Sequence, residues 1–166
     1  MKGGFVYYCL PIFPILTRGM LFLRYPKQMK ELLGEEELDR EAHRTFMLAM
    51  AGFSFSGLLA MVVLDTALRR DFHFAVYYLL LSFLCYLCAI NLQSYKAKRW
   101  QDQAAAALKD AATLCLILSV LSILNSRGFE TGFALVMSAL AILVWFIDHF
   151  LRLRFLWIFL KGRQEK

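Results

Sequence analysis

Charge and the residue types used in catalysis are scarce in this sequence. Of its 166 residues only 19% are charged, three are histidine and four are cysteine, whereas 60% are apolar. Ordinary soluble domains carry about a quarter charged and about half apolar residues. The apolar residues are concentrated in four charge-free runs, which exclude a soluble enzyme, a disordered chain and a nucleic-acid-binding domain. We therefore expect a membrane protein with no nucleic-acid partner.

Catalytic motifs are also missing. The chain has no Gly-rich phosphate loop, no Ser-His-Asp set and no H-E-x-x-H segment. His73 and His149 are expected on opposite membrane faces, so they cannot share a haem. His43 and His149 are expected on the same face, which leaves a cytoplasmic metal or proton site as a minor alternative. The sequence predicts no catalytic residue, no cofactor and no metal ligand.

The four hydrophobic runs predict an all-α polytopic membrane protein, a four-transmembrane-helix bundle. A bilayer core of about 30 Å needs roughly twenty helical residues. The charge-free runs of the third and fourth spans, 111–126 and 131–147, are shorter and must borrow flanking residues. Upstream of the third span, Ala104–Ala107 favours helix, and Lys109 and Asp110 are expected at the headgroups. The predicted spans are 45–64, 72–94, 106–126 and 131–149, which together form a bundle domain over 45–149.

The basic residues orient these spans. Sixteen Lys and Arg residues lie on the side of both termini, against three in the two opposite loops. By the positive-inside rule both termini face the cytoplasm. Trp100, Trp145 and Trp157 fall near the same boundary, where amphipathic rings prefer to lie. We predict an integral, multi-pass, N-in/C-in protein, with a bacterial inner membrane as its setting.

The two ends of the chain are predicted as separate segments. Residues 1–44 combine an apolar stretch over 5–23 with a short cytoplasmic polar helix that is interrupted at Gly34. Because Pro11, Pro14 and Arg18 would be unfavourable inside a fifth span, an in-plane or re-entrant segment is favoured. The basic, aromatic tail 150–166 is expected to continue the fourth span and to contact anionic lipid headgroups.

Small residues recur at helical spacing in three of the spans. Such stripes allow helix backbones to approach closely, and serine can hydrogen-bond across the contact. Contact within the chain is the favoured interpretation, and contact with another subunit stays open. The predicted helix-packing residues are Gly52, Ser56, Ala60, Ala111, Cys115, Ser119, Ser122, Ala134, Ser138 and Ala141.

Charged and aromatic residues are expected at the edges of the spans rather than inside them. The i,i+4 spacing predicts the ion pairs Asp65–Arg69 and Asp148–Arg152. Because no ionisable residue is expected deep in a span, a charge-driven transporter is disfavoured. The predicted residues of the cytoplasmic interface are Trp145, Asp148, His149, Arg152, Arg154 and Trp157.

The leading functional hypothesis is a non-enzymatic membrane subunit that self-assembles or binds a protein partner. An oligomeric channel or membrane-permeabilising effector lined by the serines of the third span is the alternative. A third hypothesis uses Cys85 and Cys88, a C-x-x-C pair that is similar to those of membrane thiol oxidases of the disulfide-bond B and vitamin K epoxide reductase type. Both outer loops lack cysteine, and Cys85 would lie about 20 Å along the second span. Structural cysteines are therefore favoured.

Overall fold

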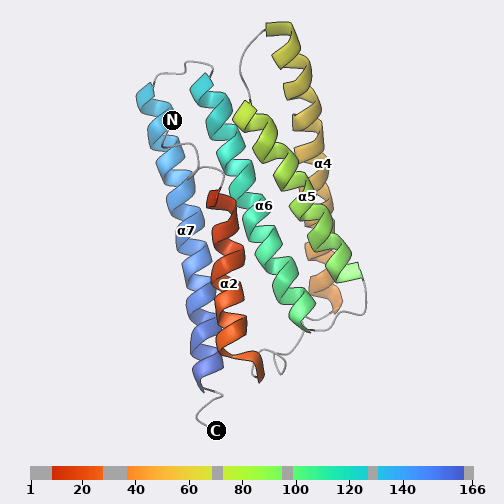
Figure 1. Ribbon diagram of the computed structural model, residues 1–166, viewed down its shortest axis with the longest axis vertical. Coiled ribbons are helices and arrows are strands. Elements are labelled where there is room, and N and C mark those ends of the chain that lie inside the picture. The colour runs from red at the N-terminus through yellow and green to blue at the C-terminus, as the bar shows by residue number, and fades with distance from the viewer. Residues whose placement is uncertain (1–8, 28–36, 69–72, 95–98, 127–130, 163–166) are drawn as a thin grey trace.

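The protein is helical throughout the part that its computed structural model describes, residues 9–27, 37–68, 73–94, 99–126 and 131–162. A short 3-10 turn precedes five α-helices, and no strand occurs in these ranges. The elements, drawn in Figure 1, are η1 (Leu10–Ile12), α2 (Phe13–Arg24), α4 (Glu37–Leu68), α5 (His73–Ser94), α6 (Arg99–Ser126) and α7 (Thr131–Gly162).

Helices α4 to α7 run side by side in alternating directions, with α4 at one edge and α7 at the other (Figure 1). Three of them are long and apolar enough to cross a membrane: Glu41–Leu64, His73–Gln93 and Gln101–Leu124. These segments coincide with the first three predicted spans and are consistent with a membrane protein. The fourth predicted span lies in α7, where the side chains of Ala134 and Ser138 fall outside the described residues.

Three helices extend beyond the predicted spans. Helix α4 already begins at Glu37, so residues 37–44 continue the first span and do not form a separate short helix. The interruption expected at Gly34 lies outside the described residues. Helix α6 begins at Arg99 and includes the alanine run. Helix α7 reaches Gly162, which confirms that the tail continues the helix before it.

The N-terminal apolar segment forms an upright helix rather than one lying across the bundle. Helix α2 runs alongside α6 and α7 in the lower half of the molecule (Figure 1). Its 12 residues give a length of about 18 Å, too short to cross a bilayer core. Pro11 and Pro14 occupy the first turns of η1 and α2, where a missing N–H does no harm. The prolines therefore begin helices and do not break them.

The main core lies between α4, α5 and α6. Buried members include Met47 and Ala51 from α4, Tyr86 from α5 and Ala112 from α6. Small side chains at this contact bring the backbones close enough for a chain of hydroxyl hydrogen bonds. Ser54 Oγ lies 3.2 Å from Ser82 Oγ, which lies 3.0 Å from the carbonyl oxygen of Ala112. Such bonds join helices where no water is available to compete.

Candidate functional site, a buried ionic cluster

A cluster of ionisable side chains lies where α2, α6 and α7 meet. The Arg18 guanidinium donates from Nη2 to Asp110 Oδ2 at 2.8 Å, and His149 Nδ1 lies 3.2 Å from the same oxygen. All three are buried, with exposed fractions of 9% for Arg18, 7% for Asp110 and 1% for His149. Charges are retained in such surroundings only when they are paired and hydrogen-bonded.

Helix geometry brings these groups together. On α6, Gln103 and Asp110 are seven residues apart and so share one face. Arg18 spans both, since its Nη1 donates to Gln103 Oε1 at 3.2 Å while Nη2 reaches Asp110. The side chain thereby links the short helix α2 to two positions on α6 that are about two turns apart. Its Nε is buried without a hydrogen-bond partner among the described residues.

The His149 ring contacts residues of its own helix and of α2. Its ring stacks on Trp145, one turn earlier on α7, with centroids 5.0 Å apart and planes inclined by 6°. Its Nε2 lies 3.1 Å from Thr17 Oγ1, and that hydroxyl donates to the carbonyls of Phe13 and Pro14 on its own helix, each at 3.0 Å.

The direction of one hydrogen bond of the imidazole follows from its partner. A carboxylate paired with a guanidinium only accepts, so Nδ1 donates to Asp110. The same carboxylate forms an ion pair with Arg18 at 2.8 Å.

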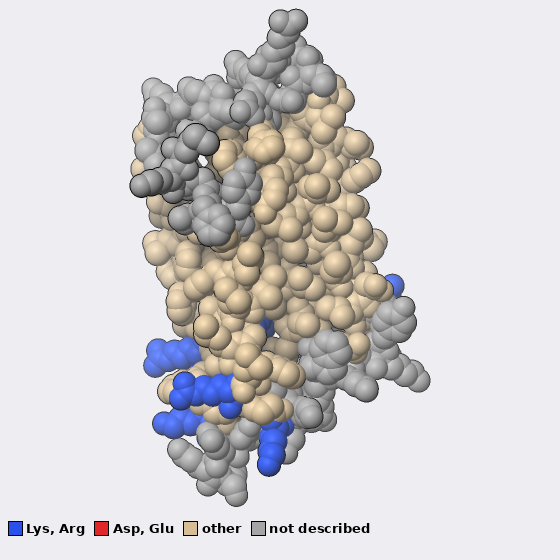
Figure 2. Space-filling model, in the orientation of Figure 1, with Lys and Arg blue, Asp and Glu red and all other residues tan. Residues whose placement is uncertain are grey.

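An apolar groove adjoins the cluster between α2 and α6. Its volume is about 490 Å³. Among the described residues that line it, Arg18 and Gln103 are polar and the others are apolar. The apolar lining residues are Ile15, Gly19, Phe22, Leu23, Ala104, Ala107 and Leu108. In Figure 2 basic side-chain atoms are recessed in a small hollow in the lower half of this face.

The cluster contains an ionisable residue inside a candidate span. Asp110 lies within Gln101–Leu124 and is buried against neighbouring helices. His149 and Trp145 are likewise buried in the bundle rather than exposed at its interface. Residues 5–23 were expected to avoid the spans because burial of Arg18 is unfavourable. The Asp110 carboxylate offsets that penalty.

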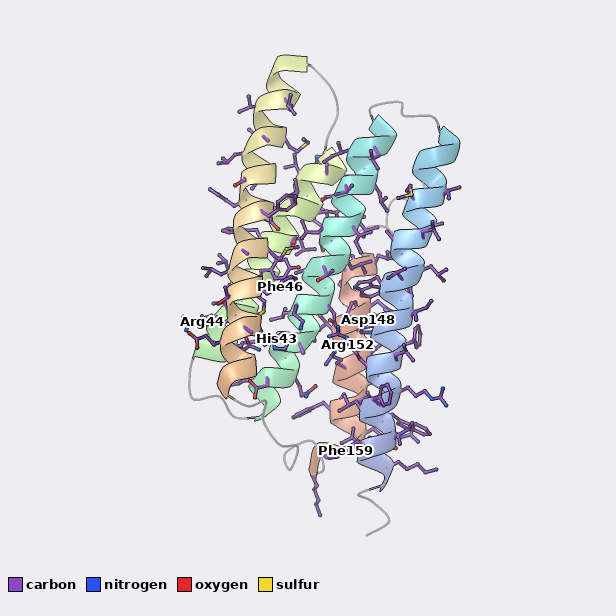
Figure 3. The ribbon with its side chains drawn as sticks, turned by 180° about the vertical axis from the view of Figure 1, so that it is seen from behind. His43, Arg44, Phe46, Asp148, Arg152 and Phe159 are labelled. Atoms are coloured by element: carbon purple, nitrogen blue, oxygen red, sulfur yellow. The ribbon has the colours of Figure 1, made fainter. Side chains whose placement is uncertain are left out.

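The other residues predicted at the interface do lie at the surface. Asp148 and Arg152 form the predicted i,i+4 ion pair at 2.9 Å, with half-exposed side chains (Figure 3). Arg154 and Trp157 are exposed further along α7, and Lys161 Nζ lies 5.6 Å from the centroid of the Trp157 ring. Of the second predicted pair, Arg69 and the Asp65 side chain fall outside the described residues.

The predicted packing stripes have different surroundings. Ala111, Cys115 and Ser119 on α6 are buried between neighbouring helices. Ser119 Oγ donates to the Leu116 carbonyl at 2.8 Å, so this hydroxyl is engaged with its own helix. Ser122 and Ala141 are partly buried. The α4 stripe of Gly52, Ser56 and Ala60 is instead exposed.

The remaining candidates for chemistry are not brought together. His43 lines a pocket of about 360 Å³ with Ala42, Phe46 and Lys109. Figure 3 shows His43 on the lower part of α4. Cys85 is buried and Cys88 exposed, and both are free thiols. Within the described ranges no group of three or more His, Cys, Asp or Glu residues could hold a metal ion.

Sequence reasoning missed Thr17, Arg18, Gln103 and Asp110 as members of one site. The available signal was an aspartate within a candidate span and an arginine in an apolar N-terminal segment, each of which requires a partner inside the bilayer.

Compared with family models, with curated proteins and with solved structures, the chain matches none of them.

Proposed function

We propose that this chain is a non-enzymatic subunit of a membrane assembly, and that copies of it associate through the outer face of α4. The observation that carries the proposal is the exposure of the Gly52, Ser56 and Ala60 stripe, on a helix at the edge of the bundle. The corresponding stripe of α6 is covered by neighbours within the chain. The α4 stripe has no such cover among the described residues.

Physical reasons favour helix contact at this face. Apolar side chains gain little by leaving lipid for protein, so small residues that allow close backbone approach determine where helices associate. A Cβ added at Gly52 would meet nothing within 4 Å. Ser56 presents a hydroxyl that can hydrogen-bond across a helix contact.

The proposal places the subunit in a bacterial inner membrane with four spans, the fourth in α7, and with both termini in the cytoplasm. Support comes from the positive-inside distribution and from the basic side chains of the described residues, which gather at the lower end of the face in Figure 2. In this arrangement α2 is a re-entrant element that enters from the cytoplasmic side, and anionic headgroups contact the basic end of α7.

Gly52→Leu tests the self-association. We expect the native protein, extracted directly into polymer nanodiscs, to give a particle mass of two or more chains. The variant should shift most particles to one chain, because a leucine separates the two backbones. Particle masses are measured by single-molecule mass photometry.

Gly132→Leu is the matched control. Gly132 is an exposed helical glycine on α7 whose added Cβ also meets nothing within 4 Å. This variant should keep the native mass. A native protein of one chain per particle, with no other protein present, would contradict the proposed function.

A further inference from the structure

We propose that His149 is a proton-binding site, at which the imidazole takes up one proton on Nε2 and the Thr17 hydroxyl turns to suit each form. The proton comes from water on the cytoplasmic side and returns to it, and no other covalent bond is made or broken. The charge of the junction between α2, α6 and α7 thereby follows the pH. The inference goes beyond the proposed association through α4 and does not depend on it.

One nitrogen of the ring keeps its hydrogen throughout. Nδ1 donates to Asp110 Oδ2 at 3.2 Å, and the same oxygen is paired with Arg18 at 2.8 Å. The tautomer of a neutral imidazole is set by the hydrogen bond that one of its nitrogens makes. The neutral ring therefore carries its single hydrogen on Nδ1, and Nε2 is the nitrogen at which a second proton binds.

The Thr17 hydroxyl provides a partner for Nε2 in either form. Its Oγ1 lies 3.1 Å from Nε2 and 3.0 Å from each of the carbonyl oxygens of Phe13 and Pro14. A hydroxyl has one hydrogen to donate and two lone pairs to accept with.

Two hydrogen-bond arrangements follow from these distances. When the ring is neutral, the Thr17 hydroxyl donates to Nε2. When the ring is charged, Nε2 donates to Oγ1 and the hydroxyl donates to a carbonyl of its own helix. Only a rotation of the hydroxyl hydrogen separates the two arrangements. Each form of the buried ring therefore has a partner at both nitrogens, and no helix has to move between them.

His149 is also the group of this junction that ordinarily changes charge near neutral pH. Its ring faces Asp110 of α6 and, beyond that carboxylate, Arg18 of α2. On its own helix, Asp148 and Arg152 pair with each other at the surface. Arginine stays charged, whereas histidine ordinarily titrates between about pH 5 and 8.

The other titratable groups nearby do not compete in this range. Tyr86 of α5 interacts electrostatically with Asp110 and with Cys115 of α6. Tyrosine ordinarily ionises near about pH 10 and cysteine near about pH 8.5. The short turn η1 contributes no charged side chain. A change of charge between about pH 5 and 8 is therefore assigned to the imidazole.

Nitrogen NMR of the full chain in micelles tests the site. The three histidines are isotope-labelled, and their signals are assigned with His43→Gln and His73→Gln. As the pH falls from about 8 to 5, we expect His149 to pass from the neutral Nδ1–H form to the cation. The nitrogen shifts distinguish these forms. A ring that keeps one form over this range would overturn the inference, and so would a neutral ring with its hydrogen on Nε2.

Thr17→Val tests the part played by the hydroxyl. Valine has a similar shape but cannot accept from Nε2, so the cation is left with a buried charged donor that has no partner. That loss exceeds the loss to the neutral ring. The proton affinity of His149 should therefore fall at least about tenfold, which moves the midpoint down by about one pH unit. An unchanged midpoint would overturn the inference.

Thr17→Ser is the matched control, because serine keeps the hydroxyl and should keep the native midpoint. Gly52→Leu should also titrate as the native chain does, even where it abolishes self-association, so the two proposals can fail separately. The helical content of each variant is compared with that of the native chain by circular dichroism. If Thr17→Val does not fold, the tautomer and the titration of the native ring decide the result.

Discussion

One carboxylate oxygen holds three helices together at the centre of the ionic cluster. Asp110 Oδ2 accepts from Arg18 on α2 and from His149 on α7 while it belongs to α6. A buried ion pair adds little net stability over apolar residues of similar volume, but removal of one partner leaves an uncompensated charge. Loss of the Asp110 carboxylate would therefore leave the Arg18 guanidinium buried without a negative partner.

Asp110→Asn should destabilise the protein strongly. The amide has no charge to oppose Arg18, so we expect the free energy of unfolding in mixed micelles to fall by about 3–5 kcal/mol. Reversible unfolding by sodium dodecyl sulfate, followed by circular dichroism, measures the change.

Asp148→Asn is the control for this variant. Asp148 belongs to a half-exposed ion pair on the same helix as His149, and loss of such a pair changes stability by about 1 kcal/mol or less. Equal effects of the two substitutions would contradict the structural role of Asp110. Replacement of Arg18 and Asp110 together by methionine and leucine should recover most of the loss, because no charge is then left unpaired.

At the scale of the helices, the close contact of α5 with α6 depends on small side chains. Ala105 and Ala112 are fully buried, and the carbonyl oxygen of Ala112 receives the hydrogen bond from Ser82. Larger side chains at such positions would separate the two backbones and break that bond.

Ala112→Leu should reduce the free energy of unfolding by about 1–3 kcal/mol, as expected of an overpacked core. The same detergent unfolding experiment measures this loss. Ala139→Leu, at an exposed position of α7, should leave stability nearly unchanged. A neutral Ala112→Leu would show that α5 and α6 are not packed as closely as described.

The helices themselves could be predicted from the sequence to a large extent. Charge-free runs predicted the positions of three candidate spans, and the alanine-rich stretch correctly extended α6 upstream. The start of α4 was missed because residues 37–44 are polar and resemble a solvated connector, although a helix can leave the membrane without a break. The polarity of a segment indicates whether water surrounds it, but it does not show where a helix begins or ends.

The ionic cluster could not be predicted, because it joins residues far apart in the chain. Arg18 and Asp110 are 92 residues apart, and no local pattern links them. Considered singly, each is unfavourable within a bilayer, which is why α2 was expected to avoid the spans. The energy of a buried charge depends on its partner, and the partner becomes visible only once three helices are assembled.

For the molecule as a whole, the proposed orientation predicts which ends are accessible from outside the cell. We expect a membrane-impermeant maleimide to label Arg127→Cys in intact cells and Arg163→Cys only in inverted vesicles. The positive-inside rule places residue 127 outside and residue 163 in the cytoplasm. Mass spectrometry of the labelled chains measures both, with the native four cysteines as background. The reverse pattern would invert the topology.

The unbroken length of α7 has a mechanical consequence. The helix contains 32 residues, about 48 Å, and His149 lies well before its basic end. No change of secondary structure separates the two. A displacement of the basic end of α7 would therefore be carried along one continuous helix to His149, and through its hydrogen bond to Asp110.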